Sequence, residues 1–323
     1  MSKLLKQFHK KAAKIQARLL FPETNDLRIL KALKKLSNLD IAKLYVLESQ
    51  SDFEKVLKKH HASFNCQKIH FLDSKKLVKN WSEQLVKIRQ DKGLTPSESQ
   101  KLLKNPNYQA VMALQENLID GVITGSYSST GDSLRPAFQV LKTNHKSSGA
   151  FLMINQGHTI IFADCAVNPN PSSIELAQIA IDTANLAKNL GLIPRLALLS
   201  YSSHGSSNHP EALKVAETAK ILRRKKVKFL FDGELQADAA LIKSIANFKA
   251  PKSAIKGNAN ILIFPNLEAG NIGYKLVERL GGYQAIGGLI LGLKKPFNDL
   301  SRGCSIEDII DLTALTCLQT KHQ

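Results

Sequence analysis

Cysteine is scarce in this chain, and its four cysteines stand far apart in the sequence. They are Cys66, Cys165, Cys304 and Cys317, and no two of them form a CxxC pair. Zinc sites need closely spaced cysteine pairs, and disulfide frameworks need a higher density of cysteines, so neither is indicated. We therefore expect no metal site and a reducing, cytoplasmic setting.

Long apolar runs are also missing. No stretch of about 18 apolar residues occurs, as a membrane-spanning helix would need. The N-terminal segment MSKLLKQFHKKAAKIQARLL mixes charges with apolar residues and lacks a small-residue cleavage site, so it is not a secretory signal. We interpret it as an amphipathic surface helix of the folded protein, and we expect no membrane partner.

Aromatic residues make up only 6% of the chain, and basic residues outnumber acidic ones, which gives a formal net charge of +18. That charge alone would suggest nucleic-acid binding. The lysines, however, are spread along the whole chain, whereas nucleic-acid sites gather Arg and Lys with aromatic residues. We predict no nucleic-acid partner, and a basic nucleic-acid-binding protein remains a distant alternative. The excess charge would instead help to attract anionic substrates.

Arginine is much rarer than lysine, with 9 residues against 36. The planar guanidinium binds phosphate and carboxylate oxygens through two parallel hydrogen bonds, so an arginine in a lysine-rich chain is a candidate for anion binding. The candidates are Arg89, Arg135 and Arg302. For each of them taken alone, an ordinary surface arginine is the alternative.

The order of predicted elements indicates an α/β protein with two domains. Short β-type runs such as 43–48 and 121–124 alternate with helical stretches, which is typical of βαβ units and a mainly parallel sheet. A second series of strands and helices follows. The C-terminal strand and helix are too short for a core of their own, so they return to the first domain. We assign residues 1–146 and 290–323 to the first domain and 147–289 to the second.

Local signals predict several element boundaries. Thr95-Pro96-Ser97-Glu98 predicts a helix start, because Thr caps the helix, Pro fits its first turn and Glu lies three residues on. Residues 1–36 are predicted as two helices broken near Phe21–Asn25. Asp232-Gly233-Glu234 is predicted as a turn, and residues 237–248 as one helix.

A polar loop follows the predicted strand at 121–124. The loop reads GSYSSTGD, from Gly125 to Asp132, and leads into an apolar-periodic helix. A strand, a Gly/Ser/Thr turn and a helix start form an anion-binding geometry, since free N–H groups and the positive end of the helix dipole face the ligand. Ser128, Ser129 and Thr130 are therefore candidate donors, while a purely structural turn remains the alternative.

Glycine is concentrated in one stretch. Pro265–Asp308 holds eight of the eighteen glycines, which indicates that backbone approaches a ligand or another backbone there. The stretch ends in Ser305-x-x-Asp308, the pattern of a capping box at a helix start. Asp308 is thus open to two interpretations, a helix-capping carboxylate or a functional one.

Six segments carry a family signature. They are STGDSLRPAFQVLKT, FADCAVNPNP, ALLSYSSHGSS, DGELQADAA, PNLEAGNIGYKLVERLGGYQAIG and KPFNDLSRGCSIEDI, in this order along the chain. With them the chain resembles the phosphate acetyl/butyryltransferase family. The resemblance implies a two-domain α/β fold similar to that of isocitrate and isopropylmalate dehydrogenases, with parallel and mixed sheets, helices on both faces, an active site in the interdomain cleft, and a homodimer.

The reaction implied by the resemblance is the reversible exchange of acetyl-CoA and inorganic phosphate with acetyl phosphate and CoA. The attack would be direct, in a ternary complex. Coenzyme A would then be a substrate, and no tightly bound cofactor is expected. A phosphate butyryltransferase, or another enzyme for longer acyl chains, is the nearest alternative, because one methylene changes discrimination by only about 1–3 kcal/mol. A nicotinamide-linked dehydrogenase of the same fold is disfavoured, since hydride transfer has no use for the SRGCS segment.

The resemblance also implies roles for single residues. Arg89 of KIRQDKG, Arg135 of SLRPAFQ and Arg302 of DLSRGCS would bind phosphate or polarise the acyl carbonyl. Ser301 would donate a hydrogen bond to the thioester or thiol. Asp308 would be the base for the CoA thiol, which is mostly protonated at neutral pH.

Four further residues are expected near this site or excluded from its chemistry. Tyr274 and Lys275 are expected to face the same cleft, with a core tyrosine beside a surface lysine as the alternative. No His is close to Cys165 in the sequence, and this residue is predicted to be structural rather than an acyl-carrying nucleophile. His204 departs from the lysine that relatives often carry.

Overall fold

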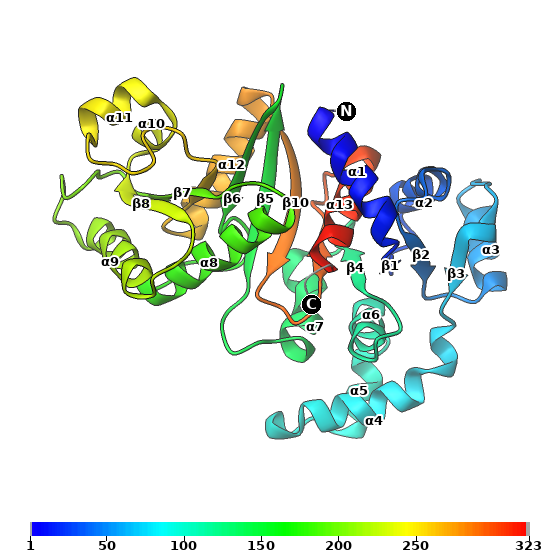
Figure 1. Ribbon diagram of the computed structural model, residues 1–323. Helices are drawn as coiled ribbons and strands as arrows, with labels where there is room; N and C mark the ends of the chain where they lie inside the picture. The colour runs from blue at the N-terminus through cyan, green and yellow to red at the C-terminus, as the bar shows by residue number, and fades with distance from the viewer. Residues whose placement is uncertain (1, 321–323) are drawn as a thin grey trace. The chain divides into compact units, whose positions relative to one another are not determined.

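The computed structural model describes residues 2–320. The chain forms two compact units (Figure 1). Unit 1 combines the N-terminal part of the chain, up to Thr143, with the C-terminal part from Leu293 onward, and unit 2 is Asn144–Gly292. The sequence-based prediction had placed these boundaries after residues 146 and 289.

Unit 1 contains a five-stranded sheet in the order β11-β4-β1-β2-β3, and every neighbouring pair is parallel. Its strands are β1 (Arg18–Leu20), β2 (Lys43–Val46), β3 (Ile69–Phe71), β4 (Gly121–Thr124) and β11 (Phe297–Asp299). All four residues of β4 are buried, so the sheet is covered on both faces at this strand.

Two groups of helices pack around this sheet. In the first group, α13 packs against α1 and α2 and also reaches β4. In the second group, α6 packs on β4 and α7, and α4 packs on α5 and α6. The longer helices are α1 (Lys3–Ile15), α2 (Leu27–Leu39), α3 (Gln50–Lys59), α4 (Val78–Ile88), α5 (Pro96–Leu102), α6 (Pro106–Gln115), α7 (Thr130–Val140) and α13 (Ile306–Gln319).

Unit 2 contains a six-stranded mixed sheet in the order β10-β5-β6-β9-β7-β8. The β10-β5-β6 part is antiparallel, and the β6-β9-β7-β8 part is parallel. The strands are β5 (Ser148–Asn155), β6 (His158–Ala163), β7 (Arg195–Leu199), β8 (Leu230–Leu235), β9 (Ile261–Ile263) and β10 (Gln284–Leu291). The helices are α8 (Ser173–Asn189), α9 (Pro210–Arg224), α10 (Ala237–Leu241), α11 (Lys243–Lys249) and α12 (Leu267–Gly281).

Capping chemistry explains several helix starts. Thr95 accepts a hydrogen bond from the backbone of Glu98, and the Glu98 carboxylate accepts one from the backbone of Thr95, so the predicted helix start is confirmed. Ser305 and Asp308 form the same reciprocal pair at the start of α13.

Three sequence-based predictions of local structure are wrong. Residues 1–36 hold the strand β1 as well as two helices, because α1 ends at Ile15 and Gln16 adopts a left-handed conformation with φ 51°. Asp232-Gly233-Glu234 lies inside β8 rather than in a turn. Its two carboxylates are buried, and they find partners there, including His204 for Asp232 and Ser202 for Glu234. The predicted helix 237–248 is divided at Ile242, which is extended.

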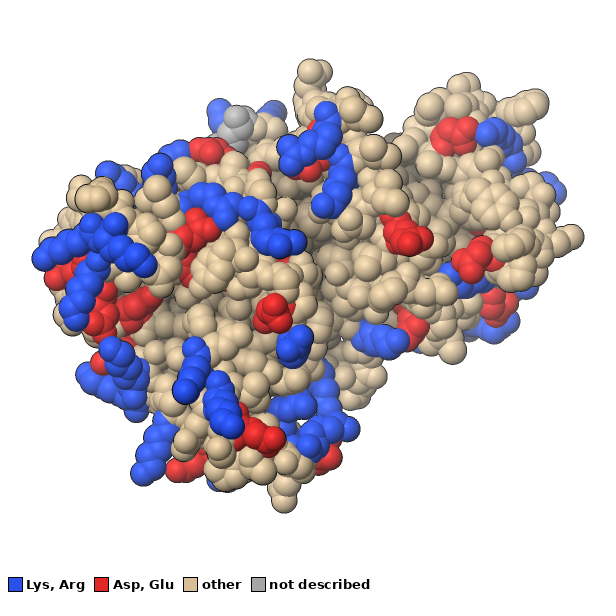
Figure 2. All heavy atoms as spheres, turned by 180° about the vertical axis from the view of Figure 1, so that it is seen from behind, with Lys and Arg blue, Asp and Glu red and all other residues tan. Residues whose placement is uncertain are grey.

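On one face of the molecule, charged side chains are spread out rather than gathered (Figure 2). The face in Figure 2 carries Lys and Arg side chains in separate groups, with acidic side chains among them. Within residues 2–320, no helix is long and apolar enough to cross a membrane.

Candidate active site

The candidate site lies at the carboxyl edge of the unit 1 sheet. The chain runs from β1 through β2 to β3 on one side of β1, and later returns to form β4 on the other side. Parallel α/β sheets bind ligands at such a reversal of strand order, beyond the carboxyl ends of the strands. The loops that follow β1, β4 and β11 all leave from this edge, and they carry most of the residues discussed below.

The loop between β4 and α7 is the polar segment that the sequence singled out. Gly125 opens it with φ +88°, and a Cβ there would collide with the Asp299 carboxylate, so only glycine fits. Ser129 caps α7 by accepting a hydrogen bond from the Asp132 N–H at 3.2 Å. Ser129 and Thr130 are exposed at the helix start, where backbone N–H groups favour anions.

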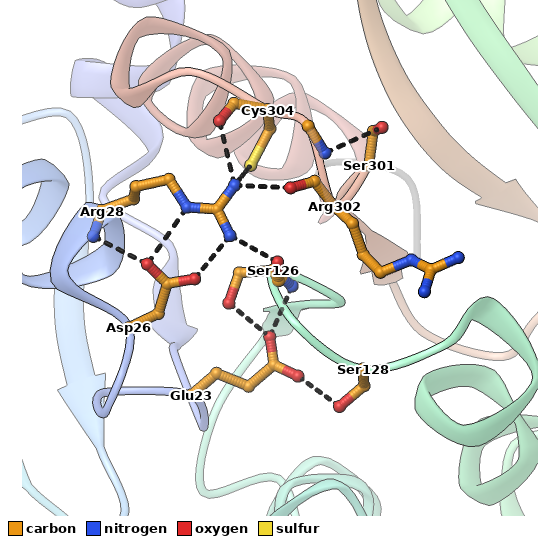
Figure 3. A network of polar contacts seen from close by, with 9 residues as sticks. Glu23, Asp26, Arg28, Ser126, Ser128, Ser301, Arg302 and Cys304 are labelled. Carbon is orange, nitrogen blue, oxygen red and sulfur yellow. Dashed lines mark hydrogen bonds and ion pairs between the residues drawn. The ribbon is translucent and has the colours of Figure 1, made fainter.

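Glu23 fixes the first half of this loop, and sequence reasoning missed it. Its side chain is buried and accepts three hydrogen bonds, from the Ser126 N–H at 2.6 Å, the Ser126 hydroxyl at 2.8 Å and the Ser128 hydroxyl at 2.7 Å (Figure 3). The proton of the Ser128 hydroxyl is thus directed at Glu23. Because Glu23 follows a three-residue strand that the sequence did not reveal, only its place beside Pro22 and Thr24 could have drawn attention to it.

Asp299 lies at the last position of β11 and faces the start of α7. It accepts a hydrogen bond from the Ser133 hydroxyl at 2.6 Å and another from the Thr130 side chain. The pKa of Asp299 is raised to about 6. Burial is the largest cause and the negative charge of Glu23 adds to it, while the two hydroxyls act in the opposite direction. Sequence reasoning missed this residue too, although it directly precedes the LSRGCS segment.

Arg28 connects the loop after β4 with the loop after β11 through hydrogen bonds to their backbones. Its guanidinium pairs with both oxygens of Asp26, at 3.1 and 2.6 Å, and donates to the carbonyl oxygens of Ser126 at 2.5 Å and Arg302 at 2.7 Å (Figure 3). Burial by itself would raise the pKa of Asp26, but the hydrogen bonds and charge of Arg28 hold it below its usual range. The sequence did not favour Arg28 over the other arginines, and its role here is structural.

Arg302 differs from Arg28 in having an unengaged side chain. It is exposed, and its guanidinium points away from the network in Figure 3. The guanidinium has no ion pair or hydrogen-bond partner among residues 2–320. The neighbouring Ser301 is exposed as well, and its hydroxyl accepts a long hydrogen bond of 3.4 Å from the Gly303 N–H. An arginine held by its backbone while its side chain stays unpaired is suited to binding an anion.

Asp308 occupies the third position of α13 and is half-buried. One carboxylate oxygen accepts from the Ser305 N–H at 2.9 Å, so the capping interpretation holds. The nearby Cys304 thiol is buried, which raises its pKa to about 11; Arg28 lowers the pKa and Asp308 raises it. A thiol with so high a pKa is a poor nucleophile.

Arg89 and Arg135 both lie near Tyr108 on the helices of unit 1. Arg89 ends α4 and is half-buried, and Arg135 is an exposed residue of α7, 3.6 Å from the Asp132 carboxylate. Burial raises the pKa of Tyr108, and the positive charges of both arginines lower it, so the two guanidinium groups are close enough to act on one phenol.

The remaining candidates belong to unit 2. Tyr274 is buried, and its ring stacks on Phe151 with 4.1 Å between centroids, so it is part of the core of this unit. Lys275 is exposed, with Nζ 5.6 Å from the Tyr274 ring. Cys165 is fully buried, and desolvation raises the pKa of its thiol well above the usual value. His204 lies 3.1 Å from a carboxylate oxygen of Asp232.

No group of three or more His, Cys, Asp or Glu side chains in residues 2–320 is placed to hold a metal ion. The charged groups of the candidate site are the unpaired Arg302 side chain, Arg89 and Arg135 near Tyr108, and carboxylates occupied by hydroxyl or N–H donors. The fold and this site define an α/β enzyme built to bind an anionic substrate.

Comparison with known proteins identifies the family. The phosphate acetyl/butaryl transferase family matches residues 3–317. A relative named phosphate acetyltransferase, from Bacillus subtilis, is 39% identical over 322 residues, which cover 99% of both chains. The solved structure of a phosphotransacetylase from Streptococcus pyogenes covers 100% of both chains with a TM-score of 0.89 and 36% identity. The chain belongs to this family and is a transferase of the acyltransferase class.

A more distant structural likeness extends to dehydrogenases. A 4-hydroxythreonine-4-phosphate dehydrogenase from Klebsiella pneumoniae covers 94% of this chain and 100% of its own with a TM-score of 0.55, at 12% identity. This likeness concerns the fold alone. The predicted α/β fold of dehydrogenase type, with one parallel and one mixed sheet, is confirmed.

Proposed function

We propose that this chain is a phosphate acetyltransferase, which exchanges acetyl-CoA and inorganic phosphate with acetyl phosphate and CoA. The observation that carries the proposal is Arg302. Its side chain is exposed and unpaired among residues 2–320, its backbone is anchored by Arg28, and it lies on the loop that leads to the Asp308 carboxylate. The full-length likeness to named phosphate acetyltransferases supports the same activity.

Phosphate would be bound by arginines and by the β4–α7 loop. Arg302 and the pair Arg89 and Arg135 offer planar donor groups that match a tetrahedral dianion. The exposed Ser129 and Thr130 at the start of α7 add hydroxyl and N–H donors under the helix dipole. The Ser128 hydroxyl already donates its proton to Glu23, so Ser128 helps to hold the loop in shape rather than donating to phosphate.

The chemical step is a direct attack of the CoA thiol on acetyl phosphate. Asp308 takes the thiol proton, the sulfur forms a bond to the carbonyl carbon, the bond from that carbon to the phosphate oxygen breaks, and phosphate leaves with the electron pair. Arg302 stabilises the charge that develops on the carbonyl oxygen and on the leaving phosphate, and Ser301 donates a hydrogen bond to the sulfur. The reverse reaction uses the same groups.

The same proposal covers partners and setting. The substrates are acetyl-CoA, phosphate, acetyl phosphate and CoA, with no tightly bound cofactor and no nucleic-acid or membrane partner, and the setting is cytoplasmic. We infer a homodimer, because α12 exposes an apolar stripe with a spacing of four residues. Ile272, Leu276 and Leu280 are 57%, 52% and 82% exposed.

The second candidate is a phosphate acyltransferase for longer acyl chains, such as butyryl. The family description covers both acetyl and butyryl substrates. The named relatives favour acetyl, and a small apolar pocket discriminates by only about 1–3 kcal/mol per methylene. Measuring kcat/KM for acetyl-CoA and butyryl-CoA with phosphate separates the two candidates.

The test of the activity itself is the formation of a thioester. The purified chain, mixed with acetyl phosphate and CoA, is expected to form acetyl-CoA, which is followed by its ultraviolet absorbance. The absence of any thioester over a range of pH and salt concentration would contradict the proposal.

A further inference from the structure

Two buried carboxylates fix the two ends of the β4–α7 loop. Glu23 accepts hydrogen bonds from Ser126 and Ser128 in the first half, and Asp299 accepts hydrogen bonds from Thr130 and Ser133 at the start of α7. Both carboxylates lie on the inner side of a loop whose outer residues, Ser129 and Thr130, are exposed. The β4–α7 loop, which we propose to bind phosphate, is thus held in shape by two buried carboxylates.

Asp299 also adjoins the loop that carries the unpaired arginine. It ends β11, and the next residue, Leu300, donates its N–H to the Thr124 carbonyl oxygen at 2.7 Å. Ser301 and Arg302 follow directly. The Gly125 turn leaves no room for a side chain beside the Asp299 carboxylate. Any shift of this carboxylate therefore moves the start of α7 and the Arg302 loop relative to each other.

We propose that Asp299 is a positioning residue of the acyl-transfer site, whose ionised carboxylate sets the geometry of the β4–α7 loop against Arg302. This inference rests on the proposed function, and it assigns to Asp299 no contact with substrate. The ionised carboxylate accepts from both hydroxyls at once. When it is protonated, its own O–H must find an acceptor, and the hydroxyls of Thr130 and Ser133 have to reorient.

The groups around Asp299 favour a change of protonation in the working range of pH. Glu23, on the β1–α2 loop, adds negative charge near Asp299. The hydroxyls of Thr130 and Ser133 on α7 donate to it, and the Gly125 turn packs against its carboxylate. The charged residues of that turn of α7, Asp132 and Arg135, are exposed and 3.6 Å from each other. With a pKa of about 6, Asp299 is ionised at pH 8 and increasingly protonated below pH 6. The affinity for acetyl phosphate should fall on that acid side.

The test compares three variants of the full chain by their dependence on pH. Asp299→Asn removes the titrating group, so the KM for acetyl phosphate should rise by about tenfold at pH 8 while the KM for CoA stays within about twofold. The acid limb of kcat/KM for acetyl phosphate near pH 6 should disappear. The titration of the substrates themselves is common to all enzymes compared, so differences between them report on the protein.

Ser133→Ala keeps the carboxylate and removes one of its donors. Since a donor stabilises the ionised form, its loss raises the pKa of Asp299 further, and the acid limb should move to higher pH. Asp120→Asn is the matched control, because Asp120 pairs with Arg18 just before β4, at the opposite end of that strand. Its pH profile should match that of the wild type.

The outcomes separate the two proposals. A wild-type enzyme that forms no thioester overturns the proposed function. An active wild type whose acid limb is unchanged in Asp299→Asn, or unmoved in Ser133→Ala, overturns the positioning role alone. If Asp299→Asn fails to fold, the direction of the shift in Ser133→Ala still decides.

Discussion

At the scale of single residues, Asp308 caps α13 and is also the proposed base, and mutation can separate the two roles. Its carboxylate caps α13 through the Ser305 N–H, and the Ser305 hydroxyl accepts from the Asp308 N–H at 3.1 Å. Asp308→Asn keeps an acceptor for the cap and removes the base, so turnover should fall by about hundredfold or more with a small change in stability. Ser305→Ala should lower stability by about 1 kcal/mol and leave turnover near the wild-type value.

The measurement is initial-rate kinetics together with thermal unfolding of both variants. If Asp308→Asn loses stability but keeps its turnover, the carboxylate is only a cap. If Ser305→Ala loses turnover as strongly as Asp308→Asn, then the cap itself positions the site.

Cys165 supplies a second prediction at this scale. The Cys165 thiol is buried, and its pKa is raised well above the usual value. The backbone carbonyl oxygen of Cys165 accepts a hydrogen bond from the Asn271 side-chain amide at 3.0 Å. A thiol held in the protonated form is a poor acyl acceptor. We therefore expect no mass increase of the protein when it is incubated with acetyl phosphate alone, and Cys165→Ala should keep its turnover within a few-fold. An acetylated protein that passes its acyl group to CoA would contradict direct transfer.

The sequence pointed to candidate residues that stand in motifs and missed the residues that hold their loops in place. Arg302 and Asp308 stand in a recognisable segment, and Asp308 lies at the helix start that its capping pattern predicted. Glu23, Arg28 and Asp299 act through partners about 100 or more positions away, such as Ser126 for Glu23 and Ser133 for Asp299. No local pattern of charge or spacing indicates such a partner, because it is defined only once the strands are adjacent.

At the scale of elements, the turn after β4 depends on one glycine. Gly125 has φ +88°, and its missing side chain makes room for the Asp299 carboxylate and the Leu300 N–H. Gly125→Ala should cost about 3 kcal/mol or more, because it adds a backbone penalty and a collision at once.

Gly93 is the matched control, since it has φ +68° and nothing within 4 Å of an added Cβ. Gly93→Ala should cost only about 1 kcal/mol. Denaturant unfolding of both variants measures the difference. Equal losses in the two variants would mean that the backbone conformation alone matters, and that the packing of Asp299 against the turn contributes nothing.

Element boundaries were predictable where capping residues mark them, and not where tertiary pairing decides. The helix start at Thr95 follows from its own four residues. The strand β1 has only three residues, and its identity comes from pairing with β2 and β4 on either side. Asp232-Gly233-Glu234 has the composition of a turn, but pairing of β8 with β7 and buried partners keep it extended.

At the scale of the whole molecule, Asp299 should make stability depend on pH. Its folded pKa of about 6 lies above the unfolded value near 4, so the folded state binds the extra proton between these values. Stability is therefore lost as pH rises through this window, by about 3 kcal/mol in total. Asp299→Asn lacks this group, so the stability of the variant relative to that of the wild type should increase from about pH 5 to about pH 8.

Asp120→Asn is again the control, because the pKa of Asp120 is lowered in the folded state whereas that of Asp299 is raised. Burial by itself would raise the pKa of Asp120, but its hydrogen bonds with Arg18 lower it. The stability that this pair contributes is complete above about pH 4 and is lost only at lower pH, so the deficit of Asp120→Asn should be constant between about pH 5 and about pH 8. A constant difference for Asp299→Asn as well would contradict the raised pKa of Asp299.

The charge of the whole molecule is better explained by substrate than by nucleic acid. Lys and Arg side chains are spread over the face in Figure 2 among acidic side chains, whereas the unpaired Arg302 lies on a loop at one edge of one sheet. A general positive field attracts anions, and a guanidinium at a fixed place binds one of them. The central claim is therefore that Arg302 at the carboxyl edge of the unit 1 sheet serves acyl transfer between CoA and phosphate.

The most direct test measures thioester formation from acetyl phosphate and CoA by the wild type, Arg302→Gln and Arg224→Gln. Arg224 is the control because it is an exposed arginine at the end of α9, paired with Glu217 at 3.1 Å. We predict a wild-type activity that Arg224→Gln retains and that Arg302→Gln lowers by about hundredfold to thousandfold. A wild type that forms no thioester, or an Arg302→Gln variant as active as the wild type, would contradict this account.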